Sequence, residues 1–141
     1  MKSMILPVLL ILLTACNETE MSNSSHQIAE TVSGTVALYP LKQKLSALYI
    51  AFTILEQDNE GGQETIITTT GFKSITHQKM PFSLIVPVER IRKENRYLLA
   101  TIISEDAQGN TEIASMTAPI LTQGQPSELN LAIKFPVEPI E

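Results

Sequence analysis

The feature that most constrains the fold is an alternation of apolar and polar residues, which runs with a period of two from Thr31 onward. In residues 128–135, for example, every second side chain is apolar. This period is typical of half-buried β-strands, and no segment shows the roughly 10–15-residue helical pattern of a parallel α/β fold. We therefore predict an all-β fold, a small antiparallel β-sandwich of about seven strands. The predicted strands are 31–39, 47–57, 64–72, 82–86, 96–104, 112–117 and 128–135.

Two of these segments, 47–57 and 96–104, are apolar on both faces, which indicates central strands. We predict that one set of side chains, including Phe52, Leu84, Leu99 and Leu131, meets between the two sheets. The opposite faces must be covered by a helical turn expected at 88–94, by a loop or by another protein, because a sandwich buries one face of each sheet. The predicted partner-binding residues are Tyr49, Leu55, Ile91, Leu98 and Ile102, and coverage by the protein's own loops is the alternative.

The N-terminus carries an export signal. Lys2 precedes an apolar run from Ile5 to Leu13, and this run is far too short for the roughly 20-residue helix that spans a bilayer. Its end, Leu13-Thr14-Ala15-Cys16, resembles the lipobox of bacterial lipoproteins. The resemblance implies cleavage between Ala15 and Cys16 and covalent acyl chains such as palmitate on Cys16. The alternatives are an ordinary signal peptide with an incidental Cys, or a buried structural Cys.

These features divide the chain into four parts. Residues 1–15 are the predicted signal peptide, and 16–30 are the lipidated Cys with a flexible tether of Ser, Asn, Glu and Thr. Residues 31–136 form the β-sandwich domain, and 137–141 are a short tail. Residue 17 is Asn rather than the Asp that resembles an inner-membrane retention signal, which favours an outer-membrane lipoprotein facing the periplasm.

Composition argues against several classes of function. The net charge is −5, which disfavours a nucleic-acid binder, and one Cys with two distant His residues provides no Cys/His metal site. His77, Ser83 and Ser115 show no spacing that pairs a nucleophile with a base. The basic run of Arg90, Arg92, Lys93 and Arg96 is interleaved with Glu89 and Glu94 and is interpreted as a solvated helical face, with a partner site as the alternative. We therefore expect no enzyme, no metal, no small-molecule substrate and no cofactor beyond the lipid.

Four segments together resemble the YbaY/YscW lipoprotein family. They are Val32–Val36, Pro81–Leu84 with Pro87, Tyr97 at the start of a strand, and Pro119–Pro126, which reads PILTQGQP. The resemblance implies a β-sandwich. Members of the YscW branch resemble pilotins, which are lipoprotein chaperones that bind the C-terminal segment of a type III secretion secretin and assist its outer-membrane targeting and ring assembly.

Two functions are therefore carried forward. The first is a pilotin-like chaperone whose apolar outer face receives the C-terminal segment of a secretin. The second is a general YbaY-like envelope lipoprotein with a structural or adaptor role and no catalytic activity. In both, the chain contacts the membrane through its lipid anchor.

Overall fold

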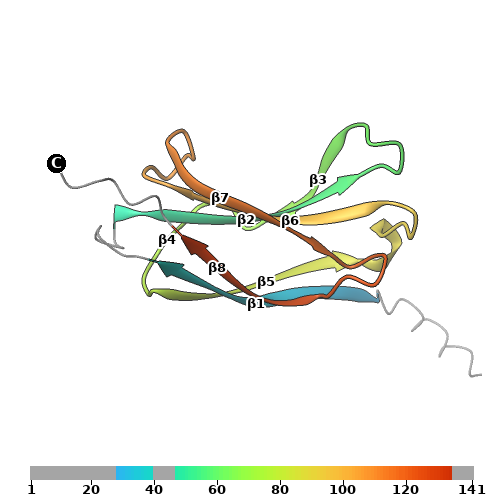
Figure 1. Ribbon diagram of the computed structural model, residues 1–141, viewed down its shortest axis with the longest axis horizontal. Coiled ribbons are helices and arrows are strands. Elements are labelled where there is room, and N and C mark those ends of the chain that lie inside the picture. Colours follow the sequence, from blue (N-terminus) through green and yellow to red (C-terminus); the bar gives the residue numbers. More distant parts are fainter. Residues whose placement is uncertain (1–27, 40–46, 135–141) are drawn as a thin grey trace, which may run out of the picture.

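The computed structural model describes residues 28–39 and 47–134, which form two packed sheets (Figure 1). The elements are β1 (Ala29–Tyr39), β2 (Tyr49–Gln57), β3 (Glu64–Thr69), β4 (Lys73–Ser74), β5 (Lys79–Pro87), the 3₁₀ turn η3 (Val88–Arg90), β6 (Arg96–Ser104), β7 (Glu112–Ile120) and β8 (Glu128–Lys134). Figure 1 shows the sheets edge-on as two layers. The predicted all-β sandwich is confirmed.

The smaller sheet has the order β5-β1-β8. β5 pairs with β1 in the antiparallel sense and lies at the edge, as expected for a strand with Pro81 and Pro87. β8 pairs with β1 in parallel, which the expected antiparallel pattern did not include. This pairing needs Gly34, because a Cβ there would overlap the backbone carbonyl oxygen of Leu129. The absence of a side chain at Gly34 therefore allows β1 and β8 to approach each other closely.

The larger sheet has the order β3-β2-β6-β7, with the two-residue β4 also paired to β2. β2 and β6 are its central strands, which confirms the prediction from their two apolar faces. β6 pairs with β2 over the full nine residues from Tyr49 to Gln57. This long pairing fixes which residues of the two strands share a face.

The core lies between the two sheets. Phe52 of the larger sheet stacks on Phe82 of the smaller one, with ring centroids 4.6 Å apart and an interplanar angle of 24°. Leu84 and Leu99 are buried in the same cluster, and Leu131 packs against it while keeping some exposure. The predicted core residues are therefore confirmed as one contiguous cluster.

Three details differ from the sequence prediction. The sheets contain eight strands, because β4 adds a short pairing that two residues cannot reveal by periodicity. β7 continues to Ile120, where a loop was expected from Pro119, since an edge strand tolerates a proline that lacks an N–H. The helical turn expected at 88–94 is only the single 3₁₀ turn η3, after which Ile91 is extended.

The predicted signal peptide, Cys16, most of the tether and the tail lie outside the described residues.

The turn between β6 and β7 is built around Asp106. Its carboxylate accepts hydrogen bonds from the backbone N–H groups of Gln108, Asn110 and Thr111, at 2.9, 3.0 and 2.7 Å. These hydrogen bonds lower the pKa of Asp106 to about 2, and the bond from the Asn110 N–H has the largest effect. The acid is therefore a turn-capping group, as such residues usually are.

Thr101 places a hydroxyl in the core. Among the described residues its Oγ1 is buried and has no hydrogen-bond partner. A buried hydroxyl without a partner costs about 1–3 kcal/mol. We therefore expect Thr101→Val, which keeps the shape, to raise the free energy of unfolding by roughly 1–2 kcal/mol in urea denaturation.

The control is Thr122→Val. The Thr122 hydroxyl is also buried, but it donates a 2.7 Å hydrogen bond to the carbonyl oxygen of Asn95. Its removal is expected to lower the free energy of unfolding by about 1 kcal/mol or more. Two changes of the same sign would contradict the assignment of Thr101 as an unpaired group.

Candidate partner-binding surface

The outer face of the larger sheet carries the predicted apolar side chains. Tyr49 and Leu55 lie on this face of β2, and Leu98 and Ile102 lie on it in β6. All four keep partial exposure, whereas the alternate side chains of both strands point into the core. The structure thus brings four of the five predicted residues onto one face of the two central strands.

An apolar row crosses all four main strands of this sheet. Leu55 of β2 pairs with Ile66 of β3 on one side and with Leu98 of β6 on the other. Leu98 in turn pairs with Pro119 of β7. We call Ile66, Leu55, Leu98 and Pro119 the apolar row. Ile66, with 63% of its surface exposed, is the most open of its three non-proline members.

The next line of pairs across the sheet carries small side chains. Thr53 pairs with Thr69 and with Ala100, and Ala100 pairs with Thr117. Ala100 is buried although it points outward, because larger neighbours flank it. The outer face therefore combines large apolar side chains with a line of small ones, which leaves room for a projecting side chain of a partner.

Ile91 does not belong to this face, so its predicted role as a neighbour of the groove is wrong. It follows η3 with φ −99° and ψ 117° and packs against the core between the sheets. The single 3₁₀ turn is too short to carry Ile91 across the larger sheet. Within the described residues, the turn leaves the outer face open.

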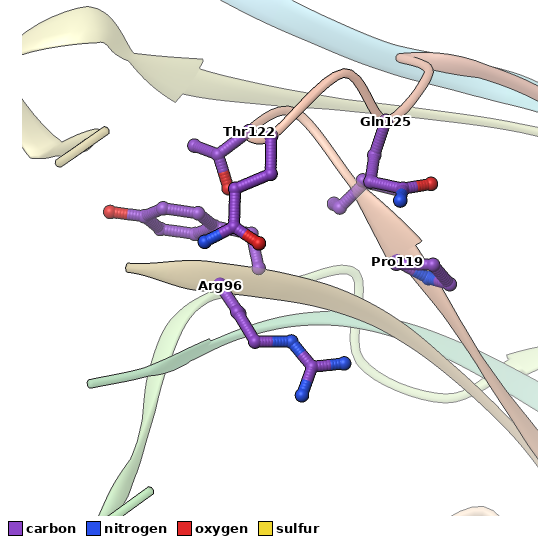
Figure 2. Close-up of a pocket in the computed structure, with 7 residues that line it drawn as sticks. Arg96, Pro119, Thr122 and Gln125 are labelled. Carbon is purple, nitrogen blue, oxygen red and sulfur yellow. The ribbon is translucent and has the colours of Figure 1, made fainter. Parts of the chain in front are cut away.

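A pocket of about 340 Å³ lies at one end of the apolar row (Figure 2). Its lining residues are Arg96, Tyr97, Pro119, Ile120, Thr122, Gln123 and Gln125. Leu121 and Gln123 have φ values of 67° and 60°, a conformation that costs non-glycine residues strain. Figure 2 shows Arg96 and Pro119 on one side of the pocket and Thr122 and Gln125 on the other. The loop 121–127 therefore sets polar side chains beside an apolar surface.

A partly buried hydrogen-bond network lies around Tyr97, which lines this pocket. The Tyr97 hydroxyl accepts a hydrogen bond from the backbone N–H of Arg92 at 2.7 Å. It has two acceptors for its own proton, Glu56 Oε1 and the Arg90 carbonyl oxygen, each 3.0 Å from the hydroxyl oxygen. Asn95 Nδ2 also donates to Glu56 Oε1, at 2.7 Å. Burial raises the pKa of Tyr97 above its usual value of 10.0. The network therefore ties the segment after η3 to both central strands.

We expect Tyr97→Phe to lower the free energy of unfolding by roughly 1–3 kcal/mol, because Glu56 and the Arg92 N–H lose a buried partner.

The raised pKa of Tyr97 also predicts that stability depends on pH. The stabilisation is complete below about pH 10 and is lost as the pH rises through the folded-state value. Urea denaturation from pH 8 to pH 11 should show this loss in the wild type and a smaller one in Tyr97→Phe. Tyr39→Phe, at a side chain 48% exposed, is the control and should change little.

The residues considered for catalysis are dispersed. His77 is exposed and its Nδ1 lies 2.9 Å from the Thr76 hydroxyl. Ser83 and Ser115 lie on the outer faces of different sheets. Within residues 28–39 and 47–134, no three His, Cys, Asp or Glu side chains gather in a way that could hold a metal ion. In the same ranges, no helix has the length and apolar character needed to cross a membrane.

Sequence comparisons found no relatives. No family model matches the chain, and a search of curated proteins found no match. The predicted cleavage site at Ala15 and lipid anchor at Cys16 lie outside the described residues and stay predictions.

A solved structure of a pilotin has a similar fold. It is an alternative pilotin from the type II secretion system of Vibrio cholerae, with a TM-score of 0.64 and 11% sequence identity. The alignment covers 79% of this chain and 100% of the pilotin. The chain therefore has a pilotin-like fold. The resemblance to the YbaY/YscW family and the link to type III secretion stay predictions.

Proposed function

We propose that this protein is a pilotin-like lipoprotein chaperone. Cys16 carries the lipid that anchors the chain to the periplasmic face of the outer membrane, and the folded domain binds the C-terminal segment of a secretin. Binding assists the secretin's targeting and assembly in the outer membrane. The observation that carries this proposal is the pilotin-like fold, which extends over the whole of the Vibrio cholerae protein.

The outer face of the larger sheet is the proposed binding surface. The apolar row and the half-buried Ile102 and Tyr49 offer a contact that excludes water. A secretin segment that forms an amphipathic helix would place its apolar side there, with a side chain over the line at Thr53 and Ala100. In such contacts a few central residues contribute most of the binding free energy. Leu55 and Leu98, which pair in the middle of the row, hold that position.

Calorimetry with the lipidated protein in detergent tests the surface. The ligands are synthetic peptides covering the C-terminal segments of the source bacterium's secretins. We expect binding to one of them, and Leu98→Asp should weaken it at least about tenfold, since it places a charge in the centre of the contact. Ser83→Asp, on the outer face of the smaller sheet, is the matched control and should bind normally.

The peptide that binds identifies the secretion system. A type II peptide would agree with the structural neighbour, and a type III peptide would agree with the resemblance to the YscW branch. If no secretin peptide binds and the secretin assembles normally in a deletion strain, the pilotin proposal is wrong. The general envelope adaptor is then the function that remains.

The anchor is tested by metabolic labelling with a fatty acid. The wild-type chain should carry the label and fractionate with the outer membrane, and Cys16→Ser should lose both properties. A Cys16→Ser chain that remains labelled and membrane-bound would contradict the anchor. Secretin multimers should also fail to reach the outer membrane in the Cys16→Ser strain, although the domain itself still folds and binds the peptide.

A further inference from the structure

Exposed apolar side chains gather at one corner of the smaller sheet. Ile28, Ile85 and Val88 are 71%, 63% and 37% exposed, and they are three of the five large apolar residues that lie open in the described part of the chain. The Val88 N–H donates a 3.0 Å hydrogen bond to the Ile28 carbonyl oxygen. Ile85 lies on the adjoining outer face, where it pairs with Thr31 of β1. The three side chains therefore belong to one corner, where β1 begins and β5 ends.

The same corner carries positive charge. Arg90 ends η3, and Arg92 and Lys93 follow in the exposed segment that leads to β6. Residues 88–94 hold three basic and two acidic side chains, a local charge of 3 − 2 = +1 in a chain whose net charge is −5. The exposed Glu30, which pairs with Val86, also lies at this corner. Exposed apolar residues beside basic ones are the composition of surfaces that rest on anionic bilayers. We call Ile28, Ile85, Val88, Arg90, Arg92 and Lys93 the basic corner.

The basic corner is also where the anchor segment joins the domain. Ile28 is followed by β1, which begins at the same end of the sandwich as η3 (Figure 1). Eleven residues, 17–27, separate it from Cys16, so the twelve residue steps from Cys16 to Ile28 span at most about 40–43 Å when fully extended. A lipid on Cys16 thus keeps this corner within that distance of the membrane. The turn at Asp106 lies at the opposite end of the sandwich, farther from the point where the tether joins the domain.

We propose that the basic corner docks on the anionic phospholipid surface in which Cys16 is anchored. This rests on the lipid anchor of the proposed function. The turn between β2 and β3, which carries Asp58 and Glu60, lies at the same end of the molecule but belongs to the other sheet (Figure 1). We call it the acidic turn. Docking through the corner of the smaller sheet therefore directs the acidic turn and the outer face of the larger sheet away from the lipid. The apolar row stays accessible to a partner while the domain rests on the bilayer.

Fluorescence of the lipidated chain in vesicles tests the docking. Cys16 is the only Cys and its sulfur carries lipid, so Val88→Cys introduces a single reactive thiol for an environment-sensitive label. The control is Gln108→Cys, an exposed position in the turn at the opposite end of the sandwich. In vesicles of phosphatidylglycerol and phosphatidylethanolamine, a quencher attached to lipid chains should quench the Val88 label about threefold more than the Gln108 label. The difference should shrink in phosphatidylcholine vesicles and at high salt.

A charge variant separates docking from anchoring. Arg90→Gln, Arg92→Gln and Lys93→Gln combined should bring quenching of the Val88 label down to that of the Gln108 label, while the chain still floats with the vesicles and binds the secretin peptide. If the Val88 and Gln108 labels are quenched equally in proteins that keep the three basic residues and float with the vesicles, the docking proposal is wrong and the anchor stands. Wild-type protein that does not float would overturn the anchor and the docking with it.

Discussion

Gly34→Ala is expected to lower the free energy of unfolding by roughly 3–5 kcal/mol, near the upper end of what single substitutions cost. The new Cβ would overlap the backbone carbonyl oxygen of Leu129, and a backbone atom cannot rotate aside as a flexible side chain does. β1 and β8 would have to separate along their parallel pairing, which runs from Ser33 to Tyr39 in β1. Since β1 is the central strand of the smaller sheet, the damage would extend to the core. Urea denaturation monitored by circular dichroism measures the loss.

Gly61→Ala is the matched control for this prediction. Gly61 also has a positive φ, of 73°, but a Cβ built there meets nothing within 4 Å. Only the conformational strain remains, which costs about 1–2 kcal/mol. Gly34 itself has a φ of 153°, which L residues rarely adopt, so the difference between the two variants reports the close approach of β1 and β8 together with the cost of that conformation. Equal losses would show that backbone conformation alone explains the requirement for glycine at position 34.

The strands and their faces were predictable because each depends on local pattern. The segments 47–57 and 96–104 are apolar at eight of eleven and six of nine positions, on both faces, which is typical of a central strand of a sheet. The parallel pairing of β1 with β8 was not predictable, since it joins segments about 95 residues apart, as in the hydrogen bond between Thr35 and Asn130. The glycine at position 34 is the one local signal of it. A glycine inside a strand often marks a close backbone approach.

The candidate surface was predictable only in its central strands. Tyr49, Leu55, Leu98 and Ile102 follow from alternation alone. Ile66 and Pro119 were missed because their places depend on the registers of β3 and β7, and the β2–β3 register shifts between Ile54 and Leu55. The shift puts Ile66 opposite Leu55, which a regular alternation from one strand to the next cannot indicate.

Ile91 was misplaced for a different reason. Charged residues around Ile91 in 88–94 suggest an amphipathic helical turn, but Pro87 precedes the segment and the chain becomes extended again at Ile91. One 3₁₀ turn presents no continuous apolar side. The side chain is instead drawn into the end of the core, beside the segment that the Tyr97 hydroxyl holds by the Arg92 N–H.

Leu99→Ala is expected to lower the free energy of unfolding by roughly 2–5 kcal/mol, the usual cost of emptying a buried leucine site. Leu99 is fully buried between the sheets, where it pairs with Ile54 and Ala118, so alanine at this position would leave a cavity in the core. Leu98 is the matched control, because it is the same residue type one position earlier and points to the outer face. Leu98→Ala should cost less than about 1 kcal/mol in urea denaturation.

The same pair of variants separates the fold from the proposed function. Leu98→Ala removes a member of the apolar row from a domain that stays folded, so it should weaken secretin-peptide binding while the midpoint of denaturation changes little. Leu99→Ala should shift the midpoint while the protein that remains folded binds the peptide with nearly normal affinity. If Leu99→Ala costs less than about 0.5 kcal/mol, the residue does not lie in the core and the facing of β6 is wrong. If both variants bind normally, the partner uses a surface other than the apolar row.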